Sequence, residues 1–130
     1  MYPIQAVIHL SHFRNNIRLI RKHIAPNVKI CAAIKADAYG HGSIEIARTA
    51  LDEQVDYLAV ARTEEAVWLR EAGIDAPILV LGLPIPDEIP LVITYRLATL
   101  VADKTVVEMI ETEAKKGGER PVLHIKVDTG

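Results

Sequence analysis

The sequence predicts an α/β fold in which parallel strands alternate with helices. Short apolar, β-branched segments alternate with amphipathic stretches along the chain, and capping residues and glycines mark the ends of the amphipathic stretches. The 130 residues are enough for one domain with a buried core. Half of them are hydrophobic and a quarter are charged, as is usual for a globular protein.

The first predicted strand, residues 6–10, is a short apolar segment that leads into a helix. Ser11 can cap this helix because a serine oxygen accepts a backbone N–H, and apolar residues follow it with helical spacing. These residues are Phe13, Ile17, Ile20 and Ile24. The pair Pro26-Asn27 then turns the chain into a second strand at residues 28–34.

A helix, a strand and another helix are predicted next. Ser43 can cap the first of these helices, and residues 57–61 form the strand. The residues of the first helix that face inward are Ile44, Ala47 and Leu51. Thr63, followed by the acidic residues Glu64 and Glu65, opens the second helix, which Gly73 can close.

The last third of the chain continues the alternation. Asp87 can cap a short helix, and Asp103 can cap a longer one that ends at Gly117-Gly118. Strands are predicted at residues 78–81, 97–101 and 122–127.

The pattern alone leaves two architectures open, a doubly wound open sheet and part of a (β/α)₈ barrel. A complete barrel takes about 250 residues. The chain has about five predicted strands after its first helix, so it cannot close an eight-stranded barrel by itself.

Residues 28–42 carry the strongest functional signal. A predicted strand ends on Lys35 and runs into a loop that contains two glycines. A lysine amine at such a position can form an imine with a carbonyl compound, as in pyridoxal phosphate (PLP) enzymes. Strand alternation places Cys31 and Ala33 on the face of Lys35, and these small side chains leave room for a ring, whereas Ile34 faces the helices. The alternative is a solvated lysine without special chemistry.

The segment at 35–42, Lys-Ala-Asp-Ala-Tyr-Gly-His-Gly, resembles the cofactor-lysine motif of the alanine racemase family. Three shorter stretches agree in order and approximate spacing: 47–51, 76–82 and 126–130. The resemblance implies a partial (β/α)₈ TIM-type barrel, with residues 1–130 as the N-terminal portion of the PLP-binding barrel and without the family's C-terminal β-rich domain. In that family the first short strand packs with the β-rich domain, so we expect residues 1–10 to be misplaced or loosely held.

The resemblance also implies a function, the PLP-dependent interconversion of L- and D-alanine by a cytoplasmic homodimer that supplies D-alanine for peptidoglycan. Lys35 would be the imine-forming lysine and one of two catalytic bases, and Tyr39 and Leu81 would contact the cofactor. Lys126 matches a lysine that carries a carbamate in several members. The second base and the phosphate-binding residues fall outside the matching positions, so we expect a fragment that is inactive alone.

Three other functions stay open. One is a related PLP-barrel racemase that acts on serine or on many amino acids. Another is a non-catalytic PLP-binding barrel protein, and the third is a small open-sheet binding module without a cofactor, in which Lys35 would behave like any other lysine.

Several classes of protein are disfavoured. The formal charge of −2 argues against a nucleic-acid binder, and no apolar run reaches the roughly 18 residues of a membrane helix. The first residues lack the features of a signal peptide, and the single Cys31 suits a reducing cytoplasm. His9 and His12 have a spacing found in metal sites, but a strand-to-helix junction would separate them, so no metal site is predicted.

Overall fold

The computed structural model describes residues 4–130, and its centre is a parallel sheet of five strands. The strands are β1 (Cys31–Ala33), β2 (Tyr57–Val60), β3 (Ile78–Val80), β4 (Ala98–Val101) and β5 (Leu123–Ile125). The helices are α1 (Leu10–His23), α2 (Lys35–Gly40), α3 (Ser43–Asp52), α4 (Thr63–Glu71), the 3₁₀ helix η1 (Pro86–Glu88), α5 (Ile89–Thr94) and α6 (Lys104–Gly117). The predicted α/β alternation is therefore confirmed.

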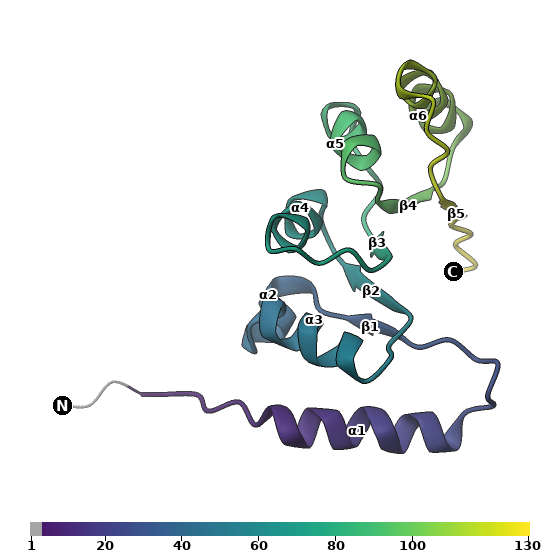
Figure 1. Ribbon diagram of the computed structural model, residues 1–130. Helices are drawn as coiled ribbons and strands as arrows, with labels where there is room; N and C mark the ends of the chain where they lie inside the picture. The colour runs from purple at the N-terminus through teal and green to yellow at the C-terminus, as the bar shows by residue number, and fades with distance from the viewer. Residues whose placement is uncertain (1–3) are drawn as a thin grey trace.

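The strands follow one another in the sheet in their order along the chain. Each strand pairs in parallel with the next one, beginning with Cys31 opposite Tyr57 and Leu58 opposite Ile78. The row of strands curves, and helices α3 to α6 lie along its outer side (Figure 1). Consecutive parallel neighbours with the helices on one side are the arrangement of a barrel wall, since a doubly wound sheet reverses its strand order and carries helices on both faces. The prediction of a partial barrel is confirmed.

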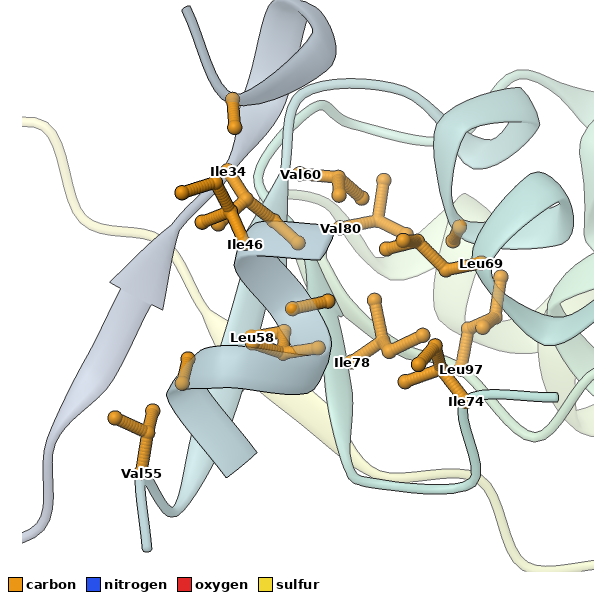
Figure 2. Close-up of a cluster of buried hydrophobic side chains, with 14 of the residues drawn as sticks. Ile34, Ile46, Val55, Leu58, Val60, Leu69, Ile74, Ile78, Val80 and Leu97 are labelled. Atoms are coloured by element: carbon orange, nitrogen blue, oxygen red, sulfur yellow. The ribbon is translucent and has the colours of Figure 1, made fainter. Parts of the chain in front are cut away.

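The core lies between the sheet and the helices that cover it. Leu58 of β2 and Ile78 of β3 point towards Ile46 of α3 and Leu69 of α4 (Figure 2). Ile34 is only 2% exposed and belongs to the same cluster, as strand alternation predicts. A smaller cluster between β4, α5 and α6 contains Ile89, Val101 and Ile110.

The predicted strand at residues 6–10 is wrong. Residues 4–9 have no regular structure, and α1 begins at Leu10. The described chain places no neighbouring strand beside them, and a lone strand leaves its backbone N–H and C=O groups unpaired. Ile8 and Leu10 nevertheless pack against the core, so this segment is held in part. Residues 1–3 of the segment expected to be loosely held lie outside the described residues.

The predicted cap of the first helix is also wrong. Ser11 lies inside α1, and His9 is its N-cap residue, whose carbonyl accepts the N–H groups of His12 and Phe13. The predicted apolar face of α1 is only partly buried, because Ile17 is buried and Ile20 is 52% exposed. No helix of residues 4–130 combines the length and the apolar character needed to cross a membrane.

Ion pairs connect α1 to the C-terminal end of α3 and to the residues that precede β2. Arg14 contacts Asp52 at 2.9 Å and Arg18 contacts Glu53 at 2.6 Å. Asp56 accepts a hydrogen bond from the Ile30 N–H at 2.8 Å and another from Arg21 at 3.2 Å. The Ile30 N–H and then Arg21 lower the pKa of Asp56, and the Arg18 guanidinium is the main reason that the pKa of Glu53 lies below its usual value.

We expect the protein to lose stability as acid protonates these carboxylates. A carboxylate with a lowered pKa in the folded state stabilises that state above its unfolded pKa, which is 3.8 for Asp56 and 4.5 for Glu53. This contribution disappears as the pH falls through the lower, folded pKa values. The midpoint of thermal unfolding should therefore fall between pH 5 and about pH 2, and the double variant Glu53→Gln, Asp56→Asn should show a shallower fall. If the midpoint of thermal unfolding falls equally steeply with decreasing pH in the two proteins, this account is contradicted.

The cap predicted for the last helix is confirmed. The Asp103 carboxylate accepts the N–H of Val106 at 3.0 Å, and Gly118 ends α6 in the left-handed conformation. Asp87 does not cap a helix as predicted, because the turn already starts at Pro86 and includes Asp87 inside η1.

Asp103→Ala should lower the free energy of unfolding by about 1 kcal/mol, because it leaves a helix N–H without its acceptor. Urea unfolding followed by circular dichroism measures this difference. Asp87→Ala is the matched control, since it removes an exposed aspartate that makes no cap, and its change should stay within about 0.5 kcal/mol. Equal losses in the two variants would show that the Asp103 cap contributes nothing.

Candidate functional site

Lys35 lies at the edge of the sheet where the carboxyl ends of the five parallel strands meet, here called the carboxyl edge. One residue, Ile34, separates it from β1, and it is the first residue of α2. Cys31 and Ala33 are exposed on the sheet face opposite the helices, as predicted, because their side chains are small and nothing in the described chain covers them. The catalytic groups of barrel enzymes stand at this edge.

The segment after Lys35 is a left-handed turn, which the sequence did not predict. Ala36, Asp37, Ala38 and Tyr39 have φ angles of 50°, 52°, 52° and 56°. A non-glycine residue pays about 1–2 kcal/mol for this conformation, so four in succession need support from the surrounding structure. The two glycines on which the sequence analysis relied, Gly40 and Gly42, only continue the turn at φ 82° and 87°.

Three hydrogen bonds support the turn. The Ala38 N–H donates to the Ile34 carbonyl at 2.9 Å, and the Gly42 N–H donates to the Asp37 carbonyl at 3.0 Å. The Asp37 carboxylate accepts the N–H of Ser43 at 2.7 Å, at the start of α3. Ser43 is therefore not the cap of α3 as predicted, because its own amide is the group that is capped.

Glu65 is a residue whose role the sequence analysis missed. The pattern indicated only favourable charge at the start of α4, but the Glu65 carboxylate also accepts the Ala36 N–H at 2.6 Å. It further accepts the N–H groups of Ala61 and Arg62. A glutamate at the third position of a helix can fold back onto its N-cap residue, and this pattern could have indicated the Arg62 contact. No local pattern reports the contact with Ala36, which lies far away in the sequence.

Tyr39 and Leu81 also lie at the carboxyl edge. Tyr39 belongs to the left-handed turn, and its side chain is 60% exposed. Leu81 follows β3, donates its N–H to the Val60 carbonyl at 2.8 Å and is 37% exposed. The ends of β2 and β3 approach closely here, since a Cβ on Gly82 would come within 2.6 Å of the Ala61 carbonyl oxygen. The contact of either side chain with a cofactor stays a prediction.

Lys126 lies beyond the end of β5, with β2, β3 and β4 between its strand and β1. Its N–H donates to the Val101 carbonyl at 2.8 Å, and its Nζ lies 3.5 Å from the Asp128 carboxylate. This ion pair suits a cationic ammonium, whereas a carbamate would place two negative charges together. The carbamate on Lys126 stays a prediction.

His9 and His12 are close, so the expectation that they are separated is wrong. Their ring centroids are 5.0 Å apart, because His9 caps α1 and His12 lies in its first turn. Within residues 4–130, no group of three or more His, Cys, Asp or Glu side chains is placed to hold a metal ion.

Sequence comparisons identify relatives over the whole chain. The family described as "Alanine racemase, N-terminal domain" matches residues 8–130. An alanine racemase from Treponema denticola is 46% identical over all 130 residues, and one from Desulforamulus reducens is 44% identical over 128 residues, or 98% of the chain. The chain covers 34% and 35% of these two proteins, so it spans about a third of the length of its curated relatives.

Solved structures show the same fold. Alanine racemase from Clostridium difficile 630 superimposes with a TM-score of 0.86 and 40% identity, over 92% of this chain and 31% of that one. A histidine racemase from Leuconostoc mesenteroides superimposes with a TM-score of 0.83 and 26% identity, over 93% of this chain and 32% of that one. The motif around Lys35, the barrel wall that carries it and these relatives agree: the chain belongs to the alanine racemase family, whose N-terminal domain it matches from residue 8 to residue 130.

Proposed function

We propose that this chain supplies the cofactor-bearing lysine of a PLP-dependent alanine racemase. The observation that carries the proposal is the position of Lys35, at the carboxyl end of β1 and directly before the left-handed turn that bears Tyr39. The 46% identical relative from Treponema denticola is an alanine racemase, which supports the interconversion of L- and D-alanine as the reaction. We propose that the D-alanine is used for peptidoglycan. A complete site would need the second catalytic base that the family takes from another subunit.

The residues at the carboxyl edge fit PLP in three respects. The small, exposed side chains of Cys31 and Ala33 leave space beside Lys35 on the open sheet face. Leu81 offers an apolar surface for a ring, and the exposed hydroxyl of Tyr39 can donate a hydrogen bond to a phosphate. Apart from Cys31, which begins β1, these residues lie at or beyond the carboxyl ends of β1 and β3, so one edge of the sheet presents them together.

Each residue has a definite task in this proposal. When bound, PLP supplies an electron sink for the substrate carbon that loses its proton. Lys35 would hold the cofactor through Nζ, and its amine, when not attached to the cofactor, would accept or return the α-proton of the substrate on one face. Tyr39 would orient the cofactor through its phosphate. Racemisation needs a second base on the opposite face, and we propose that a homodimer supplies it.

Borohydride trapping with PLP, followed by peptide mapping, tests the proposal directly. Borohydride fixes PLP on the lysine that it occupies, so the map reports which amine reacts. The other lysines are internal controls: Lys22, Lys29, Lys104, Lys115, Lys116 and Lys126. Preferential labelling of Lys35 supports the proposal, and even labelling of all lysines in a protein with a complete barrel contradicts it.

A chimera provides the complete barrel. In this chimera the chain replaces the matching segment of the Clostridium difficile alanine racemase, to which it is 40% identical. Labelling that is even in the 130-residue chain but selective in the chimera would show that the remaining barrel wall completes the site. The same sample, analysed by mass spectrometry at neutral pH without acid, also tests for a carbamate on Lys126.

A second candidate function is racemisation of another amino acid. The histidine racemase from Leuconostoc mesenteroides has this fold at 26% identity, so the fold is compatible with a different substrate. The test compares the racemisation rates of alanine, serine and histidine by the chimera. The unaltered Clostridium difficile enzyme is the reference, so the difference between the two proteins measures what this chain contributes to the substrate preference.

A further inference from the structure

The carboxylate of Glu65 joins the ends of two strands. One oxygen, Oε1, accepts the N–H of Ala36 at 2.6 Å, a short distance along the chain from the end of β1. The other oxygen, Oε2, accepts the N–H of Ala61 at 2.7 Å and that of Arg62 at 3.0 Å, directly after β2. Glu65 itself is partly buried in the first turn of α4. A single side chain from α4 therefore fixes both backbones at the carboxyl edge.

The hydrogen bond to Ala36 lies at the start of the strained left-handed turn. Ala36 is the first of the four residues in the left-handed turn, and it directly follows Lys35. A hydrogen bond to a carboxylate is stronger than one to a neutral acceptor, and its loss would leave the N–H at the start of a strained segment to solvent alone. The other supports of the turn act further along, at Ala38, Gly42 and Ser43.

We infer that Glu65 is a positioning residue that holds Lys35 and Tyr39 in a fixed relation through the left-handed turn. Lys35 precedes the turn and Tyr39 is its last left-handed residue before the glycine, so the conformation of the turn sets the offset between the lysine amine and the tyrosine hydroxyl. The inference rests on the proposed function. In that function the lysine amine and the tyrosine hydroxyl need a spacing that lets them reach the reactive carbon and the phosphate of the same PLP molecule.

Glu65→Gln is the test variant, and Glu64→Gln is its matched control. A glutamine has one acceptor oxygen, so it cannot accept N–H groups at both strand ends as the carboxylate does. Glu64 is adjacent and exposed, and its carboxylate contacts only the Arg62 guanidinium, at 3.2 Å, among the described residues. Both variants remove one negative charge, so a difference between them reports the position of the carboxylate and not the net charge.

Two measurements report the effect of Glu65→Gln on the turn and on Lys35. Amide hydrogen exchange of the 130-residue chain should be about tenfold faster at Ala36 in Glu65→Gln, because its hydrogen bond to a charged group is lost. In the chimera, the preference of PLP for Lys35 over the other lysines should fall about tenfold. Glu64→Gln should change both quantities less than twofold.

A purely structural role of Glu65 gives a different result. If Glu65 only caps α4, Glu65→Gln lowers the midpoint of thermal unfolding but leaves the labelling preference for Lys35 unchanged well below that midpoint, and this result overturns the inference.

A rescue variant decides the case in which Glu65→Gln does not fold. Ala36→Gly, added to Glu65→Gln, removes the steric penalty of the left-handed backbone at the position that has lost its support. Recovery of folding and of Lys35 labelling in the double variant supports the inference, and failure to recover overturns it. If the unaltered chimera shows no preference for Lys35, the proposed function fails and the positioning role fails with it, whereas exchange at Ala36 still shows whether Glu65 holds the turn.

Discussion

Lys35→Ala in the chimera is expected to lower the rate of alanine racemisation by about 10²–10⁴-fold, the range that a single general acid–base group contributes. In the proposed function this amine attaches the cofactor and moves the proton on one face, and no other lysine lies directly before the left-handed turn. Lys29→Ala is the control, because Lys29 lies before β1, at the opposite end of the same strand, with its Nζ 5.8 Å from the centre of the Tyr57 ring.

The measurement is the rate at which L-alanine is converted to D-alanine, with folding of each variant verified by circular dichroism. Lys29→Ala should retain the rate within about twofold. A Lys35→Ala chimera that keeps more than a tenth of the unaltered rate would show that Lys35 is not a base of this reaction. If added methylamine restores part of the lost rate, the missing function is that of an amine.

Arg70→Met is expected to give the largest loss of stability among single polar substitutions, about 3 kcal/mol in the free energy of unfolding. The Arg70 guanidinium donates hydrogen bonds to the carbonyls of Tyr95 at 2.9 Å and Ala76 at 2.7 Å, and also to that of Ile74. Desolvation lowers the pKa of Arg70, but an arginine remains protonated at neutral pH. Methionine fills a similar space and leaves these carbonyls without a donor.

Arg48→Met is the control for this prediction. Arg48 is exposed and reaches the carbonyl of Ala72 at 3.3 Å, so its replacement should cost no more than about 0.5 kcal/mol. Urea unfolding gives the free energy of unfolding of each variant and of the unaltered chain. The dependence of this free energy on urea concentration is fitted for each protein. Similar costs for Arg70→Met and Arg48→Met would mean that water replaces the guanidinium at the three carbonyls.

The sequence predicted the features that depend on local patterns. The alternation of apolar segments and amphipathic stretches gave β1 to β5 in the right order, because parallel strands with a covered side have few polar residues. The cap at Asp103 was predicted correctly because a cap is a contact within one turn of a helix. The strands are shorter than predicted, since apolar residues continue past the last paired residue, as at Ile34.

The features that depend on distant contacts were not predictable. Alanine and tyrosine seldom adopt positive φ, and one aspartate, a residue that adopts it more often, does not indicate a left-handed turn over residues 36–39. The turn contacts Glu65 and the start of α3, and both lie outside residues 36–39. The predicted strand at residues 6–10 fails for the related reason that a strand needs a partner, and its own sequence does not show whether a partner is present.

The order of the strands has a consequence for how the protein is made. Each of the strands β2 to β5 pairs with the strand synthesised just before it, as Ile78 of β3 does with Leu58 of β2. Each βα unit can therefore pack against the strands already folded when it leaves the ribosome. It does not require a segment that is synthesised much later. The exposed edge of the newest strand is then the template for the next one, so the wall can grow vectorially, one unit at a time, from β1 onwards.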